Sequence, residues 1–198
     1  MSTAKPLIED PTVSKRVIHA VATVLDCDEA KISVSSSLSE LGAESLDYLD
    51  IAFSLEREFN IHFPRVDALQ RAVLHFGEEQ LWSQGKVTEF GLELLKQGMP
   101  ELNLGQKELK LADLRNLFVV ATLVRVVNRL LQAKAEMSTQ CPQCNGTLTE
   151  VADSPEFRCA SCGHTVPFPA GDDVMSADLI AIGTRLRPPA AVSVVQDS

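Results

Sequence analysis

The apolar positions of the first 65 residues predict two helices separated by a loop. Val13, Val17 and Val21 recur at the spacing of one helical face, which predicts a helix from about 12 to 25. Residues 26–43 are mostly polar and keep only isolated apolar anchors, so they are expected to form a long loop.

A second amphipathic helix is predicted from about Leu46 to Phe59. Pro64 ends it, because a proline pushes the residues before it into extended geometry. The residues expected to face inward are Tyr48, Ile51, Ala52, Leu55 and Phe59.

The middle of the chain predicts two short helices followed by a long one. The short helices are expected at about 66–83 and 88–97, with Thr88 capping the second. Helical spacing returns at about 111–135, which predicts a long helix with polar last turns. Its inward side is expected to contain Leu114, Leu117, Phe118, Ala121, Val124, Val127 and Leu131. Trp82 and Phe90 are expected to fill the core, the alternative being that they line a ligand pocket.

The chain changes character at Cys141. Two Cys-x-x-Cys pairs follow, the first of them in "CPQCNG" and the second in "CASCGH", and the segments "TLTEVA" and "EFRC" between them are expected to form short strands. Two such turns can complete a tetrahedral four-sulfur site, which predicts a structural Zn²⁺ ion and a fold that resembles a zinc ribbon. The expected ligands are Cys141, Cys144, Cys159 and Cys162. Iron with the same ligands, a redox pair and coincidence are the alternatives.

Composition favours a mainly α fold, since 45% of the residues are hydrophobic, only 5% are aromatic, and Leu, Val and Ala dominate. The net charge is −9, with −6 on residues 1–70, +2 on 71–135 and −5 on 136–198. An acidic surface repels phosphate backbones and anionic lipids, so no nucleic acid is expected as a partner, and a basic protein surface fits better.

No membrane span or secretory leader is expected. The most apolar run, 117–131, is short and interrupted by Arg125, Asn128 and Arg129, and the first residues lack a basic start before an apolar stretch. Four cysteines in metal-like spacing indicate a reducing compartment, with the cytoplasm as the expected location.

Ser45 stands between Leu41-Gly42 and the second helix, and it has two interpretations. On spacing alone it is an ordinary helix N-cap, whose hydroxyl accepts a backbone N–H. Alternatively, its hydroxyl points outward and carries an anionic group, which the positive end of the helix would stabilise.

The order of motifs decides between these interpretations. "VSKRVIHAVATVLD", "ISVSSSLSELGA", "ESL" and "LEREFNIHFP" follow one another over residues 12–65, and "LKLADLRNLF" begins a later helix. Together, residues 12–65 and 109–131 resemble the acyl carrier protein family, four-helix proteins that carry 4′-phosphopantetheine. Two departures stand out: Glu44 replaces the aspartate usual before the serine, and residues 66–108 form an insertion that the family does not explain.

The resemblance implies a carrier and not an enzyme. Ser45 would be the phosphopantetheine attachment site, modified by a phosphopantetheinyl transferase, and the arm would hold acyl groups as thioesters. Fatty acid, polyketide or related lipid biosynthesis would be the setting. The partners would be acyl-transferring or acyl-modifying enzymes with basic docking patches.

Acidic residues near Ser45 are expected to serve that docking, the alternative being a solvated helix face. Glu44, Asp47 and Asp50 are the main candidates, because like charges spaced three apart do not stabilise a helix. Glu40, Glu56 and Glu58 complete the set.

The expected organisation is therefore an acyl-carrier-like helical domain over 1–135, a small β zinc ribbon over 136–170, and a loosely ordered tail over 171–198, of which 178–186 could pack. The ribbon is expected to dock proteins or cap the fold, because between Glu136 and Gly171 only Arg158 is basic. An adaptor that keeps the carrier fold without the arm is the alternative function. A catalytic metalloprotein is disfavoured, since four protein sulfurs leave no open coordination position.

Overall fold

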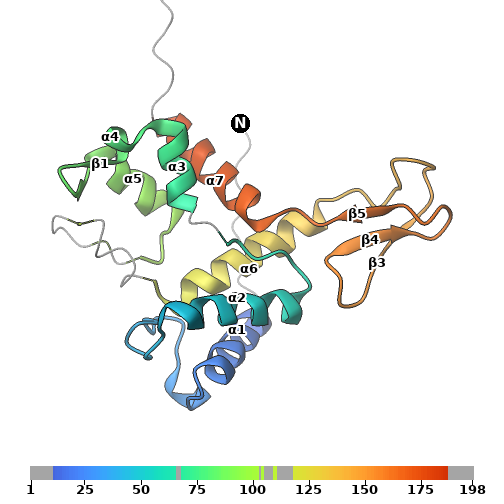
Figure 1. The fold of residues 1–198 in the computed structure, drawn as a ribbon, viewed down its shortest axis with the longest axis horizontal. Helices are drawn as coiled ribbons and strands as arrows, with labels where there is room; N and C mark the ends of the chain where they lie inside the picture. Colours follow the sequence, from blue (N-terminus) through green and yellow to red (C-terminus); the bar gives the residue numbers. More distant parts are fainter. Residues whose placement is uncertain (1–10, 66–67, 103, 105–108, 111–117, 187–198) are drawn as a thin grey trace, which may run out of the picture.

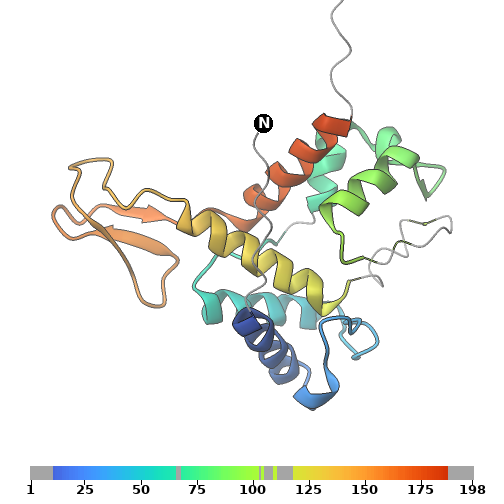
Figure 2. The same cartoon turned by 180° about the vertical axis from the view of Figure 1, so that it is seen from behind.

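The fold is mainly helical, with two small antiparallel sheets, in a computed structural model that describes residues 11–65, 68–102, 104, 109–110 and 118–186 (Figure 1). Among these residues the helices gather into two hydrophobic clusters, and a small β unit projects from them in both views (Figures 1 and 2). No described helix has the length and apolarity that crossing a membrane requires.

The first cluster is a three-helix core. It joins α1 (Pro11–Val24), α2 (Ser45–Phe59) and α6 (Val120–Ala135), and the loop between α1 and α2 contains a short 3₁₀ helix, η1 (Glu29–Lys31). The predicted inward stripes are confirmed, with Val17, Val21 and Leu55 fully buried. The two predicted helices therefore form because burial of one apolar stripe outweighs their modest propensity.

The long helix predicted from about 111 begins later. Residues 111–117, with Leu114 and Leu117, lie outside the described part of the chain. Phe118 and Val119 are not helical: the Phe118 carbonyl accepts the Leu38 N–H at 3.1 Å, and Val120 N–H donates to Ser36 at 3.0 Å. The loop before α2 thus uses the backbone groups that would otherwise extend α6, and α6 starts at Val120.

The second cluster is formed mainly by buried residues between Leu69 and Leu104, with Leu179 packed against them. It contains α3 (Ala68–Phe76), α4 (Glu78–Leu81), a hairpin of β1 (Trp82–Ser83) and β2 (Lys86–Val87), and α5 (Glu89–Gly98). The single helix predicted at 66–83 is therefore wrong, because Gly77 adopts φ +87° and breaks it. The Thr88 cap is confirmed, since its hydroxyl accepts the Gly91 N–H at 3.0 Å.

Residues 171–186 form a regular helix, α7 (Gly171–Leu186), so the expected loose tail is wrong there; residues 187–198 lie outside the described chain. Met175 joins the first cluster and Leu179 the second. Two glycines lower the helix propensity of this segment, yet both are needed for its packing. A Cβ on Gly171 would lie 2.4 Å from the His62 carbonyl oxygen, and one on Gly183 would lie 2.4 Å from the Phe76 ring.

The β unit has three antiparallel strands in sequential order: β3 (Leu148–Glu150), β4 (Glu156–Cys159) and β5 (Thr165–Pro167). Leu148 pairs with Cys159 and Phe157 with Val166. The strands expected in "TLTEVA" and "EFRC" are confirmed, and β5 was not predicted. The hydrophobic cluster of this unit contains three buried residues, two of them cysteines, so the unit has little core of its own.

A polar contact fixes the root of this unit to the helices. Glu150 accepts a hydrogen bond from Asn60 Nδ2 at 2.7 Å and forms an ion pair with Lys134 Nζ at 2.6 Å. Burial opposes ionisation of the Glu150 carboxylate, but these two donors outweigh it, so its pKa lies below the ordinary value. The charged form of Glu150 therefore ties α2 and α6 to β3.

Candidate functional site

Ser45 is exposed and begins α2. Gly42, at φ +89°, turns the chain just before it in a conformation that L side chains rarely adopt. Among the described residues the Ser45 hydroxyl has no hydrogen-bond partner. The N-cap position belongs to Glu44, so the interpretation of Ser45 as an ordinary N-cap is wrong.

Asp47 closes the first turn of α2. Its Oδ2 accepts the backbone N–H of Glu44 at 2.7 Å, and the Asp47 N–H donates to the Glu44 carbonyl at 3.0 Å. This exchange holds the turn that presents Ser45. Because Ser45 lies at the N-terminal end of α2, the helix dipole makes the position of its hydroxyl favourable for a negatively charged group.

Several of the acidic side chains expected to dock partners have internal roles. Glu56 accepts the Phe63 N–H at 2.9 Å, and Glu58 pairs with Arg16 at 2.6 Å. Asp50 and Glu40 are exposed and make no side-chain contact of this kind within the described chain, and Glu44 is exposed as well. The acidic face is therefore divided between residues that hold the fold and residues available to a partner.

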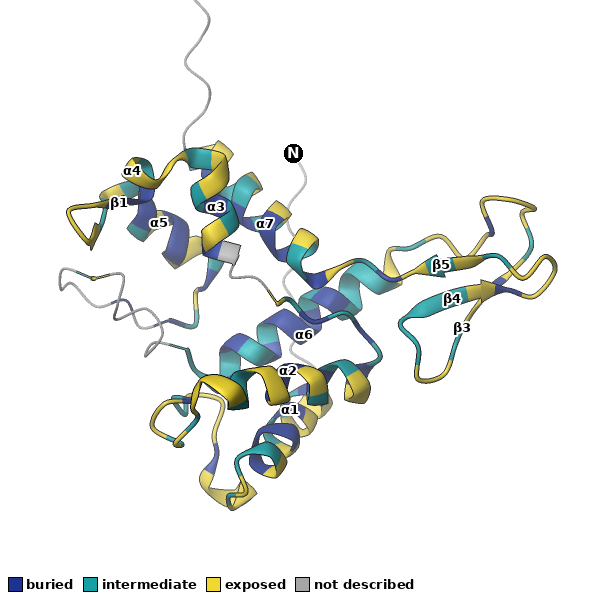
Figure 3. Cartoon of the chain, viewed as in Figure 1, coloured by how far each residue is buried: buried dark blue, intermediate teal, exposed yellow. Residues whose placement is uncertain are grey.

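The outer face of α2 also carries exposed apolar side chains, which sequence analysis assigned no role. Leu46, Leu49 and Phe53 are 73%, 46% and 52% exposed and recur at helical spacing directly after Ser45. Figure 3 shows this face of α2 as largely exposed. The sequence could have indicated this exposed apolar face, because these three residues do not belong to the predicted inward stripe of the helix.

A cleft of about 900 Å³ opens beside Ser45. One side is formed by α2 and α6, and the other by the end of α5 and by α7. The lining is mostly apolar and includes Ala43, Leu46, Leu49, Phe63, Met99, Leu123, Met175 and Leu179. Trp82 and Phe90 do not line it, and Trp82 is buried in the second cluster as expected.

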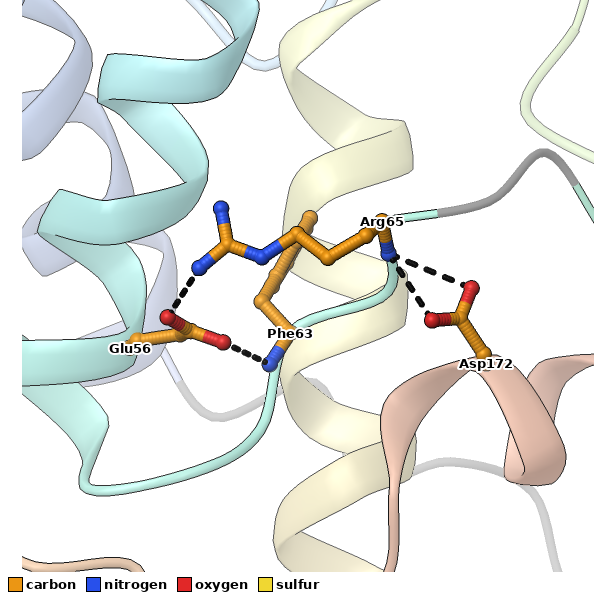
Figure 4. A network of polar contacts seen from close by, with 4 residues as sticks. All are labelled: Glu56, Phe63, Arg65 and Asp172. Carbon is orange, nitrogen blue, oxygen red and sulfur yellow. Dashed lines mark hydrogen bonds and ion pairs between the residues drawn. The ribbon is translucent and has the colours of Figure 1, made fainter.

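A polar network fixes one edge of this cleft (Figure 4). Glu56 on α2 binds the Phe63 N–H and the Arg65 guanidinium, and the Arg65 N–H donates to both carboxylate oxygens of Asp172 at 3.2 and 3.1 Å. The Arg65 guanidinium also lies 3.8 Å from the centre of the Phe53 ring. The extended segment after α2 is thereby held between α2 and the start of α7.

Two further ion pairs join α6 to the opposite side. Arg125 Nε donates to both oxygens of Glu101, at 2.9 and 3.0 Å, and both side chains are at most 15% exposed. Arg129 binds Asp178 on α7 through Nε and Nη2, at 2.7 and 3.0 Å. The hydrogen bonds that Arg129 donates to the Asp178 carboxylate raise the pKa of Arg129 despite its burial. These pairs hold α5 and α7 at a fixed position across the cleft.

The four cysteines lie together within the β unit. Their sulfurs are all within 4.8 Å of one another, with Cys141 to Cys162 at 3.7 Å and Cys144 to Cys159 at 3.5 Å. A tetrahedral ion with Zn–S bonds of about 2.3 Å places its sulfurs about 3.8 Å apart, so this set fits Zn²⁺.

The thiols also differ in their readiness to ionise. The Cys162 and Ser161 backbone N–H groups lower the pKa of Cys159 to about 6. For Cys144, a hydrogen bond from the Gly146 backbone favours the thiolate, but the neighbouring cysteine thiols, Cys162 first, raise the pKa to about 12. The cluster thus supplies a thiolate near neutral pH, and a bound cation would favour the others.

Comparison with known proteins identifies the segment around Ser45. Residues 15–74 match the family model described as "Phosphopantetheine attachment site". Residues 15–74 are therefore a phosphopantetheine attachment domain. The match includes Ser45, Gly42 and all of α2, and it ends within α3, beyond residue 65, where the first segment of the sequence resemblance ends. The second segment of that resemblance, 109–131, lies outside the match. No solved structure matches the chain.

The matched segment packs against a distant part of the chain. Its helices α1 and α2 share a core with α6, which begins 46 positions after the match ends. The intervening α3 packs instead against α7. Carrier domains of this type interact with a phosphopantetheinyl transferase and with modifying enzymes, which fits a serine held at an exposed helix start.

Proposed function

We propose that this chain is an acyl carrier protein whose 4′-phosphopantetheine arm is attached to Ser45. The observation that carries the proposal is the exposed Ser45 hydroxyl, without a protein hydrogen-bond partner in the described chain, at the first turn of α2 within the matched segment. The chain would carry acyl groups and would not catalyse their chemistry.

Attachment needs little from the carrier itself. In the transfer, Ser45 Oγ bonds to the phosphorus of coenzyme A that carries the pantetheine group. The diphosphate bond breaks, adenosine 3′,5′-bisphosphate leaves, and a base of the transferase takes the hydroxyl proton. The product is a phosphodiester whose negative charge lies at the N-terminal end of α2, where the helix dipole stabilises it. The terminal thiol of the arm then holds the acyl group as a thioester.

The setting proposed is fatty acid, polyketide or related lipid biosynthesis, in the cytoplasm. Glu44 and Asp50, which are exposed, would meet the basic patches of partner enzymes, with Asp47 contributing charge from within the capped turn. Four reduced cysteines in a metal-like cluster support a reducing compartment.

The β unit is proposed to bind one structural Zn²⁺ through Cys141, Cys144, Cys159 and Cys162 and to dock a partner protein. The distances between the sulfurs support binding of the ion. The small core suggests that the unit needs the ion in order to fold. Metal analysis of purified protein tests this: one zinc per chain is expected, and folded protein without stoichiometric metal would contradict it.

The experiment for the arm is intact-mass analysis after incubation with coenzyme A and a phosphopantetheinyl transferase. Wild type should gain one phosphopantetheinyl group, and Ser45→Ala should gain none. Ser54→Ala, on the same helix, is the matched control and should be modified like wild type. A folded wild-type protein that resists several transferases would favour the alternative, an adaptor without the arm.

A further inference from the structure

The helix α7 joins the two hydrophobic clusters of the described chain. Its Met175 belongs to the first cluster and its Leu179 to the second. The helix packs against α3, α5 and α6, and its Asp178 binds Arg129 of α6. The position of α7 therefore helps to determine how the second cluster lies on the core of α1, α2 and α6.

The β unit is the connection between α6 and α7. The chain leaves α6 at Ala135, passes through the β unit and enters α7 at Gly171 (Figure 1). Residues 136–170 are thus a tether of 35 residues that joins α7 to α6. If the β unit unfolds, α7 remains attached to the core by a long flexible chain only.

The cysteine cluster would cross-link this tether near both of its ends. Cys141 is the sixth residue after α6, Cys162 lies nine positions before Gly171, and their sulfurs are 3.7 Å apart. An ion held by both leaves 15 residues, 136–141 and 162–170, as free tether. The effective concentration of a tethered group falls roughly as the −3/2 power of the tether length, so this shortening raises that of α7 about fourfold.

The folded β unit also binds the end of α6. Lys134, in the last turn of α6, forms an ion pair with Glu150 of β3 at 2.6 Å and lies 4.5 Å from the centre of the Phe168 ring. Phe168 is buried, and its ring packs against that of Phe157 with centres 4.8 Å apart. These contacts hold the chain against α6 only three positions before α7. They require a folded β unit, and the small core of that unit leaves its folding to the metal.

We propose that the β unit is a metal-controlled clasp for α7. With the ion bound, the unit holds α7 against α3, α5 and α6. Without it, α7 separates at least fourfold more readily, because its tether is longer and the contacts of Lys134 are lost. The second cluster is then held less firmly on the core of α1, α2 and α6. This inference rests on the zinc site of the proposed function.

The first experiment compares hydrogen exchange of the full chain with zinc bound and after its removal by a chelator, followed by mass spectrometry. Protection of the α7 amides should fall at least fourfold, because protection reports how often a segment opens. Protection of α1 and α2 should change less than twofold. Unchanged protection of α7, or an equal loss in α1, α2 and α7, would overturn the clasp.

Two insertions test the tether directly. A Gly-Ser segment of ten residues between Pro169 and Ala170 lengthens the free tether of the zinc-bound protein from 15 to 25 residues, so α7 protection should fall at least twofold. The same segment between Asp153 and Ser154 is the matched control. It lies at a turn within the part of the tether that the ion bypasses, so α7 protection should not change. After zinc removal the two variants should be alike, and equal effects in the zinc-bound proteins would overturn the clasp.

Metal analysis of the same samples separates the possible failures. One zinc per chain, with α7 protection that does not respond to its removal, would overturn the clasp and leave the zinc site standing. Folded protein that holds no zinc and fully protects α7 would overturn both. Neither result depends on modification of Ser45, which intact-mass analysis tests on its own.

Discussion

The Asp47 carboxylate is expected to stabilise the turn that presents Ser45 more than it serves a partner enzyme. Its Oδ2 accepts the Glu44 N–H at 2.7 Å, so Asp47→Ala removes an acceptor at the start of α2. Loss of a capping contact costs about 0.5–2 kcal/mol, and loss of negative charge in a first turn costs about 0.3–1 kcal/mol. We expect the free energy of unfolding to fall by about 1–2 kcal/mol.

Two variants on the same helix sharpen this prediction. Asp47→Asn keeps an amide oxygen as acceptor but loses the charge, so about 0.5 kcal/mol should be lost. Asp50→Ala removes an exposed carboxylate with no such contact in the described chain, so its effect should stay within about 0.5 kcal/mol.

The assay is urea unfolding of all three variants, followed by circular dichroism, with transferase kinetics measured in parallel. The order of stability loss should be Asp47→Ala, then Asp47→Asn, then Asp50→Ala. Equal losses for Asp47→Ala and Asp50→Ala would refute the capping argument. A slower transferase reaction for Asp50→Ala, at unchanged stability, would identify Asp50 as a docking residue.

Three further predictions concern stability. The Thr122 hydroxyl oxygen is buried without a hydrogen-bond partner in the described chain. Thr122→Val should therefore raise the free energy of unfolding by about 1 kcal/mol, whereas Thr122→Ser should not. A loss of stability in the valine variant would contradict this. The pKa of Glu150 is lowered in the fold, so its contribution is present above its unfolded pKa, near 4.3, and is lost as pH falls through the lower folded value. Urea midpoints of Glu150→Gln should therefore vary less than wild type below about pH 5, and equal slopes would refute the role of Glu150. Chelation of zinc should abolish dispersed amide NMR signals of residues 141–168 while those of α1 and α2 remain, and a β unit that stays folded without metal would contradict the metal-dependent account.

Periodicity located the elements whose burial follows a single stripe. Val13, Val17 and Val21 of α1, and Ile51, Leu55 and Phe59 of α2, are buried as predicted. These positions are local in sequence, and each helix contributes one face to one core. The cysteine cluster was predictable for a similar reason, since two tight turns with fixed spacing can meet at a single ion.

Elements that depend on distant partners were predicted poorly. The start of α6 is set by backbone hydrogen bonds to residues 34–38, far earlier in the chain. The helix α7 contains Gly171 and Gly183, which disfavour helices locally but allow close contact with His62 and Phe76. Neither contact leaves a periodic signal in the sequence.

The candidate site shows the same division. Ser45 and its motif could be found from sequence, and the acidic residues beside it could be named. The hydrogen bond from the Glu44 N–H to Asp47 is local to the first turn of α2. The contact of Glu56 with Phe63, and the cleft walled by Met99 and Leu179, depend instead on how the segment after α2, α5 and α7 approach the core of α1, α2 and α6. Sequence spacing carries no information about that approach.

The most direct test of the central claim is peptide mapping of the protein purified from its native host. The account predicts that a single peptide, the one containing Ser45, carries a phosphopantetheinyl group, with or without an acyl thioester. Native protein in which Ser45 is unmodified under all growth conditions, or in which another residue carries the arm, would contradict it.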